Sequence, residues 1–142
     1  AKDYVRMMWM ILQAEEAEDW VIATGKTTTV RKFVKMSFAE VGIELEFTGV
    51  GIHEKATVIK CNNPAFQIEI GKEVVCIDPT YFRPTEVDLL IGDSTKAKTK
   101  LGWVLEHDLA SLINDMMQSD IKLMQRDQYL KEGGHYTSNS FQ

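Results

Sequence analysis

Three stretches of the chain carry apolar residues at the three- and four-residue spacing of an amphipathic helix. The first runs from Asp3 to about Ala14, and its apolar positions are so many that we expect it to be wedged between layers. The second follows Thr28 or Thr29, either of which can cap a helix with its hydroxyl, and stops at Gly42. The third is long, and its apolar face consists of Leu109, Leu112, Ile113, Met116, Leu123 and Met124.

Shorter apolar or alternating runs predict strands. The run from Trp20 to Ala23 is wholly apolar, as expected of a buried strand in a parallel sheet, and Val87 to Ile91 is another strand. Further β-rich pieces lie in the middle of the chain, at residues 44–48, 57–61, 66–70 and 73–77. Gly71-Lys72 separates the last two like a hairpin turn. The pattern predicts an α/β fold, with short strands packed by helices and a β-hairpin insertion in the middle.

The segment after these strands predicts one more short helix. Asp93-Ser94-Thr95 offers a cap, Lys96 to Leu101 forms the helix, and Gly102 ends it before a packed Trp103. The lysines of this helix, Lys96, Lys98 and Lys100, are interpreted as a solvated face. We expect a domain over residues 1–130 and a flexible tail over residues 131–142, because the end of the chain is polar and rich in Gly, Ser and Asn.

Composition and charge narrow the function. The chain of 142 residues has a net charge of −5, which argues against nucleic acid as a partner but allows one phosphorylated ligand at a local cationic spot. Its longest apolar run is far too short for a membrane span, and no leader pattern suggests secretion, so we expect a cytoplasmic protein. The start at Ala1 suits a fragment or a processed chain better than a natural beginning.

The cysteines and histidines do not form a metal-binding pattern. Cys61 and Cys76 are too few and too far apart for a zinc site or a disulfide framework, although a single bridge between them stays open. His53, His107 and His135 stand alone, without the spacing that a metal site uses. We therefore predict no metal, and free thiols in a reducing compartment.

The box Arg83-Pro84-Thr85-Glu86 carries the candidate binding chemistry. Arg83 presents a fork of donors that matches phosphate oxygens two at a time. Pro84 suits the first position of a helical turn, and Glu86 then lies on the same side of the turn as Arg83. A carboxylate there can accept hydrogen bonds from both hydroxyls of a ribose. Taken alone, the box is better explained as a plain helix start with a surface arginine and an acidic residue against the helix dipole.

Several stretches taken in order resemble the C-terminal half of the extended short-chain dehydrogenases/reductases that act on nucleotide sugars, and the GDP-mannose 4,6-dehydratase family in particular. The resemblance runs from Ala1 to about Met124 and departs most at residues 51–72 and beyond Arg126. The stretches that carry it are Ala1-Lys2-Asp3-Tyr4-Val5-Arg6, Asp19-Trp20-Val21-Ile22-Ala23-Thr24-Gly25, Thr29-Val30-Arg31-Lys32-Phe33-Val34, Tyr81-Phe82-Arg83-Pro84-Thr85-Glu86-Val87-Asp88, Gly92-Asp93-Ser94-Thr95-Lys96-Ala97-Lys98 and Lys100-Leu101-Gly102-Trp103.

This resemblance implies a substrate-binding role. It implies Arg83 on the pyrophosphate and Glu86 on the ribose of GDP-mannose, within a parent enzyme that uses NADP to form GDP-4-keto-6-deoxymannose, on the route to GDP-fucose and related deoxysugars. It also implies an N-terminal Rossmann half as partner and a homo-oligomer of the parent. Asp3 is interpreted as an N-cap, and Arg31 as solvated or salt-bridged rather than a ligand.

The absence of two motifs limits the functions that we expect of this chain. It has no Gly-x-Gly-x-x-Gly or Gly-x-x-Gly-x-x-Gly turn for a coenzyme pyrophosphate. None of Tyr4, Tyr81, Tyr129 and Tyr136 is followed by a lysine four residues on, so the family's Tyr-x-x-x-Lys base is missing. We therefore expect no coenzyme on this chain and no activity from it alone. A related epimerase or reductase, or a non-catalytic nucleotide-sugar binding module, stays open as an alternative.

Overall fold

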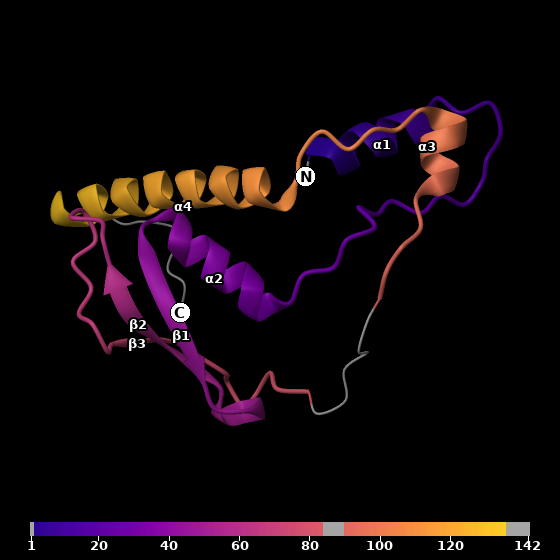
Figure 1. Ribbon diagram of the computed structural model, residues 1–142. Helices are drawn as coiled ribbons and strands as arrows, with labels where there is room; N and C mark the ends of the chain where they lie inside the picture. The colour runs from indigo at the N-terminus through magenta and orange to yellow at the C-terminus, as the bar shows by residue number, and fades with distance from the viewer. Residues whose placement is uncertain (1, 84–89, 136–142) are drawn as a thin grey trace.

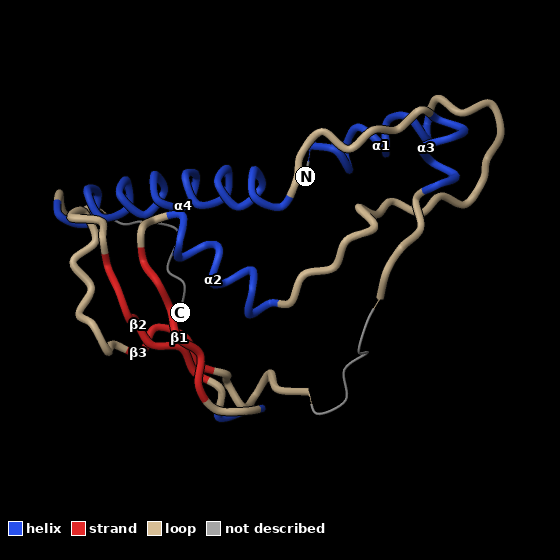
Figure 2. The backbone as a smooth tube through the Cα atoms, in the orientation of Figure 1, coloured by secondary structure: helices blue, strands red, loops and turns tan. Residues whose placement is uncertain are grey.

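The computed structural model describes residues 2–83 and 90–135. Figures 1 and 2 show a sheet with two helices at one end of the molecule and a pair of helices at the other end. In chain order the elements are α1 (Lys2–Leu12), α2 (Val30–Glu40), β1 (Ile43–Thr48), the 3-10 turn η1 (Gly51–His53), β2 (Lys55–Cys61), β3 (Glu73–Cys76), α3 (Thr95–Leu101) and α4 (Leu109–Glu132).

The three strands form one antiparallel sheet in the order β1-β2-β3. Side chains of β1 alternate between buried and exposed, as the sequence predicts for a half-buried strand. On the solvent side, Lys60 Nζ lies 2.9 Å from Glu44 Oε1, its register partner, and Lys55 Nζ lies 3.1 Å from Glu73 Oε2. Opposite charges on neighbouring strands favour this pairing register over registers in which one strand is shifted along the other.

The sheet core consists of four buried side chains, Ile43, Leu45, Ala56 and Val58. Helix α2 covers it with Val34 and Phe38, joined by Val41 at the C-cap, and α4 packs against α2 in turn. The predicted limits of α2 are confirmed: the hydroxyl of Thr29 accepts a hydrogen bond from the backbone N–H of Lys32, and Gly42 follows the helix with a φ of 77°. A second apolar layer therefore closes one face of the sheet.

The helical core lies at the other end and consists of Met7, Ala97 and Trp103. It joins α1 to α3, which are far apart in sequence but lie side by side in Figure 1. The predicted stop of α3 is confirmed, since Gly102 has the left-handed φ of 64° that few other residues adopt. The next residue, Trp103, is buried, and its Nε1–H donates to the carbonyl oxygen of Asp3 at 3.2 Å.

Other sequence predictions differ from the structure. Trp20 to Ala23 belongs to no strand of the described residues, and Phe66 to Ile70 is also not a strand. The prediction of a hairpin turn at Gly71-Lys72 was therefore wrong. Residues 62–72 connect the paired strands β2 and β3, and within this connection Gly71 and Lys72 form hydrogen bonds with the backbone of Val58. Of the strand predicted at 87–91, residues 90 and 91 are not in a strand and the rest lie outside the described residues.

The cysteines are free thiols, as the sequence suggested. Cys76 pairs in register with Lys55, at the opposite end of β2 from Cys61, so the alternative of a bridge is excluded. At the end of the chain α4 continues to Glu132, so Lys131 and Glu132 are helical rather than part of the tail, and residues 136–142 lie outside the described residues. No described helix is both long and apolar enough to cross a bilayer.

Candidate functional site

Arg83, the predicted phosphate ligand, is exposed at the end of a turn that follows β3. The turn is fixed by Asp78, whose carboxylate accepts from the N–H of Thr80 at 2.8 Å and whose carbonyl accepts from the N–H of Tyr81 at 3.1 Å. The ring of Phe82 lies beside Gly51 of η1, which anchors the turn to the end of the sheet. Arg83 therefore follows a supported turn and is exposed.

The arginines of the chain fall into two kinds. Arg6, Arg31 and Arg126 each form an ion pair, with Glu106, Glu54 and Asp127 respectively. Within residues 2–83 and 90–135, no ion pair includes Arg83. Pro84, Thr85 and Glu86 lie outside the described residues, so the second half of the predicted site is not described.

Arg31, interpreted from the sequence as solvated or salt-bridged, forms an ion pair with Glu54. Its Nε donates to Glu54 Oε1 at 2.5 Å, and the guanidinium carbon lies 5.9 Å from the centre of the Phe47 ring. The hydrogen bond from Arg31 lowers the pKa of the Glu54 carboxyl and outweighs burial, which raises it. This pair ties α2 to the loop after η1, so Arg31 is occupied by a structural contact.

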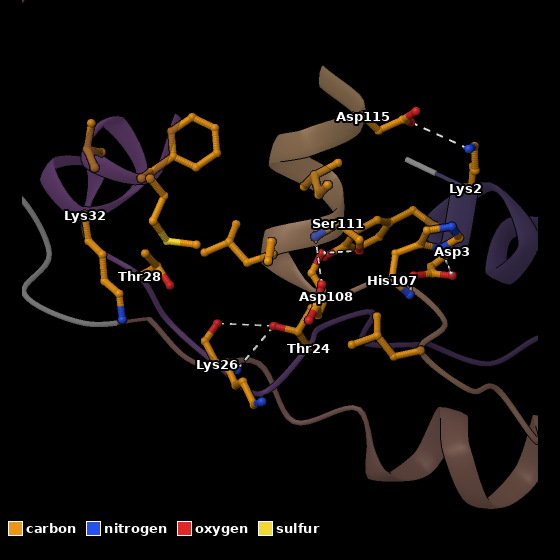
Figure 3. Close-up of a pocket in the computed structure, with 18 residues that line it drawn as sticks. Lys2, Asp3, Thr24, Lys26, Thr28, Lys32, His107, Asp108, Ser111 and Asp115 are labelled. Carbon is orange, nitrogen blue, oxygen red and sulfur yellow. Dashed lines mark hydrogen bonds and ion pairs between the residues drawn. The ribbon is translucent and has the colours of Figure 1, made fainter. Parts of the chain in front are cut away.

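A cavity of about 720 Å³ lies between the start of α1, the loop before α2, and the first turn of α4. This volume is in the range of small-molecule sites. Its apolar lining includes Phe33, Met36, Leu105, Leu109 and Leu112. Charged and hydroxyl side chains form much of the rest of the lining, and Figure 3 labels Lys2, Asp3, Thr24, Lys26, Thr28, Lys32, His107, Asp108, Ser111 and Asp115.

Several polar groups of the cavity are already engaged with each other. Asp108 caps α4 by accepting from the N–H of Ser111 at 2.8 Å, and the bonds from Ser111 lower the pKa of the Asp108 carboxyl. Lys2 pairs with Asp115 at 3.6 Å. Lys26 and Lys32 form no ion pair within the described part of the chain. Arg83 does not line this cavity, so the structure does not bring the predicted ligand and the cavity together.

Asp3 is buried and has a different role from the N-cap that the sequence suggested. Its carboxylate accepts from the backbone N–H of Glu106 at 3.3 Å and of His107 at 3.0 Å, and Oδ1 lies 3.1 Å from His107 Nδ1. Burial raises the pKa of the Asp3 carboxyl, but the hydrogen bonds and charge of His107 outweigh it and hold that pKa below its ordinary value. The carboxylate therefore joins the start of α1 to the segment before α4.

Asp3, Glu106 and His107 bring three potential metal ligands within 4.8 Å of one another, so His107 does not stand alone as the sequence suggested. The described residues hold this cluster by internal contacts: Asp3 accepts backbone N–H groups, and Glu106 pairs with Arg6. Local spacing could not have revealed the cluster, because Asp3 and His107 are 104 residues apart. The cluster therefore connects α1 to the segment before α4.

Two of the three lysines on α3 also form specific contacts, unlike the solvated face that the sequence predicted. Lys100 Nζ lies 2.7 Å from Glu18 Oε1, and Lys96 pairs with the same carboxylate while lying 4.7 Å from the centre of the Trp20 ring. Hydrogen bonds from Lys100 and Lys96 lower the pKa of Glu18 to about 2. The acidic loop after α1 is thus held against α3.

The described residues offer two groups of side chains suited to binding. They present a free guanidinium at the end of the sheet and a partly apolar cavity with two unpaired lysines. No hydroxyl or thiol of the cavity is hydrogen-bonded to a histidine in the manner of an activated nucleophile, within the residues described.

Comparison with known proteins places this sequence in a family. The family model described as GDP-mannose 4,6 dehydratase matches residues 1–116. The GDP-mannose 4,6-dehydratase of Yersinia enterocolitica is 49% identical over 135 residues, covering 94% of this chain and 36% of the relative. That of Vibrio cholerae serotype O1 is 49% identical over 138 residues, covering 95% of this chain and 36% of the relative.

The likeness extends to animals: the GDP-mannose 4,6 dehydratase of Homo sapiens is 44% identical over 124 residues, covering 87% of this chain and 31% of the relative. The chain thus spans about a third of the length of the curated relatives it matches, and the matched part is their C-terminal part. The family model covers most of the chain, including α1, the sheet and α3. The chain belongs to the GDP-mannose 4,6-dehydratase family.

Proposed function

We propose that this chain is the nucleotide-binding part of a GDP-mannose 4,6-dehydratase. The complete enzyme would use NADP to convert GDP-mannose to GDP-4-keto-6-deoxymannose, and the present residues would hold the GDP portion while the reaction proceeds elsewhere. Binding energy from such a remote group orients the reacting sugar. A cytoplasmic location and a homo-oligomeric parent are further predictions of the same proposal.

The state of Arg83 carries this proposal. It is the one arginine without an ion pair in the described part of the chain, whereas Arg6, Arg31 and Arg126 are all paired. A guanidinium that is exposed on a supported turn is free to bind two phosphate oxygens at once. The net charge of −5 means that this local cation acts against an acidic background, which favours one discrete phosphate site over a broad basic surface.

Glu86 completes the proposed site by accepting hydrogen bonds from the ribose hydroxyls. Its distance from Arg83 in the sequence is three residues, which in a helical turn puts both side chains on one side. The two residues would then bind neighbouring groups of one nucleotide, Arg83 the diphosphate and Glu86 the sugar.

The proposal places the coenzyme outside this chain. A dinucleotide pyrophosphate is usually held by a turn with several glycines at the N-terminus of a helix. Here the loop before α2 contains the single glycine Gly25, and the first turn of α2 is capped by the protein's own Thr29. We therefore assign no step of the redox chemistry to these residues. NADP and the acid/base groups would belong to the N-terminal part of the enzyme.

The test is a binding measurement on a complete-length polypeptide, made by joining this chain to the N-terminal part of the Yersinia enterocolitica relative. Arg83→Ala should weaken GDP-mannose binding by about 1.5–3 kcal/mol, roughly 10- to 150-fold in Kd, the range for a charge-assisted hydrogen bond. Isothermal titration calorimetry gives the Kd directly.

Arg126→Ala is the matched control, because it removes an arginine that already pairs with the neighbouring Asp127. It should leave the Kd for GDP-mannose unchanged. Equal affinities for the Arg83→Ala variant and the parent polypeptide would remove Arg83 from the site and leave the proposal without its main support.

A further inference from the structure

The turn that leads to Arg83 is built by both the side chain and the backbone of Asp78. Its carboxylate oxygen Oδ1 accepts from the N–H of Thr80 at 2.8 Å, and its carbonyl oxygen accepts from the N–H of Tyr81 at 3.1 Å. Pro79 occupies the second position of this turn, which its fixed φ suits. Two hydrogen bonds and a proline therefore shape the backbone between the end of β3 and Arg83.

The backbone of Arg83 is also restricted by its immediate neighbours. Before it, the N–H of Phe82 donates to the carbonyl oxygen of Pro79 at 3.4 Å, and the Phe82 ring lies beside Gly51. After it comes Pro84, whose ring pushes the preceding residue toward extended conformations. Arg83 is thus exposed, but its backbone has few conformations open to it.

A restricted backbone favours the binding of a phosphate group. A guanidinium that binds two phosphate oxygens must approach them in one plane and from one direction. If the backbone that carries the guanidinium moves freely, its ordering costs free energy at the moment of binding, and the affinity falls. A turn that is already formed in the free protein removes much of this cost.

We propose that Asp78 is a positioning residue for the diphosphate of the nucleotide. Its carboxylate holds the turn, and the turn holds Arg83 in the orientation that binds the phosphate oxygens. This inference rests on the proposed function and deepens it, because Asp78 acts only through Arg83. The carboxylate acts as a hydrogen-bond acceptor toward Thr80, so its negative charge is not required.

A second turn of the same design supplies a matched control. Asn63 is followed by Pro64, as Asp78 is followed by a proline. The side-chain Oδ1 of Asn63 accepts from the N–H of Ala65 at 3.0 Å, and its carbonyl oxygen accepts from the N–H of Phe66 at 3.2 Å. This turn follows β2, at the opposite end of the sheet from the end of β3. Only the turn after β3 leads to the predicted phosphate ligand.

The experiment is isothermal titration calorimetry of GDP-mannose with variants of the complete-length polypeptide described above. Asp78→Ala should weaken binding about 3- to 10-fold in Kd, the change that corresponds to the loss of one hydrogen bond. Asp78→Asn should restore the parent affinity, because an amide oxygen accepts the same N–H. Asn63→Ala should leave the Kd unchanged, and far-UV circular dichroism checks that each variant is folded.

A double-mutant cycle separates positioning from a merely structural role. In the Arg83→Ala background, Asp78→Ala should leave the Kd unchanged, because no guanidinium remains for the turn to position. An equal loss of affinity with and without Arg83 would overturn the proposal. So would an equal loss from Asn63→Ala, or a failure of Asp78→Asn to restore binding.

This inference and the proposed function fail in different ways. If Arg83→Ala weakens binding while Asp78→Ala does not, Arg83 is a ligand that Asp78 does not position. If Arg83→Ala leaves the Kd unchanged, the proposed site is wrong and the positioning role falls with it.

Discussion

The two cores of this protein differ in how far they are completed by their own chain. The sheet core forms from residues 43–58 and is covered by α2, so its strands find their hydrogen-bond partners within about 35 residues of sequence. The helical core gathers residues that are far apart in the sequence and still leaves Val5, Met8, Trp9 and Leu12 of α1 exposed. Adjacent exposed apolar side chains, unlike scattered ones, mark interaction sites on soluble proteins.

The largest expected effect is on the helical core. Trp103→Ala removes a side chain that is 1% exposed and deletes its bond to Asp3, so it should cost about 3–5 kcal/mol of unfolding free energy. Hydrogen exchange should then show α1 losing protection while β2 keeps it. If protection fell equally in α1 and β2, the two cores would be a single cooperative unit and the comparison would fail.

Leu45→Ala is the converse change in the sheet core. Leu45 is 7% exposed, and its loss should cost about 2–5 kcal/mol by leaving a cavity beneath α2. Exchange should accelerate in β1 and β2 and stay slow in α1, measured on the same amides as for Trp103→Ala. Unchanged protection of β1 would show that α2 collapses into the space.

The smallest effect concerns the acidic loop that α3 holds. The pKa of Glu18 is lowered to about 2, so its contribution to stability is complete above the ordinary carboxyl pKa near 4.5 and is lost as the pH falls toward 2. Glu18→Gln should remove this part of the acid dependence, measured as the urea midpoint between pH 5 and pH 2. Glu16→Gln, on the same loop, is the control and should keep the parent's acid dependence. Matching curves for the Glu18→Gln variant and the parent would show that the two lysine contacts do not stabilise the fold.

Sequence patterns predicted the helices well and the contacts between the ends of the chain poorly. The limits of α2 and α3 follow from local chemistry, a threonine hydroxyl before one and a left-handed glycine after the other. Asp3 was interpreted as a local cap because a sequence shows only neighbours, whereas its partners lie at Glu106 and His107. Trp20 to Ala23 read as a strand because apolar runs indicate burial, but a strand also needs a neighbour, which no pattern within the run can specify.

The candidate site shows the same division. Arg83 could be chosen from its box and its resemblance, and its lack of an ion pair within the described residues agrees with a binding role. The cavity between α1, α2 and α4 could not be foreseen, because its lining comes from segments as far apart in the sequence as Lys2 and Asp115. Spacing rules describe one element at a time and carry no information about such gaps.

The hydrogen bonds that Asp3 accepts from Trp103 and His107 can form only late in synthesis of the chain. They close loops of 100 and 104 residues, so α1 leaves the ribosome long before its partners exist. The sheet, whose strands end at Cys76, can be finished in that interval. Until Trp103 is synthesised, the helical core lacks its largest side chain, so Met7 of a nascent chain stays incompletely covered while the sheet forms.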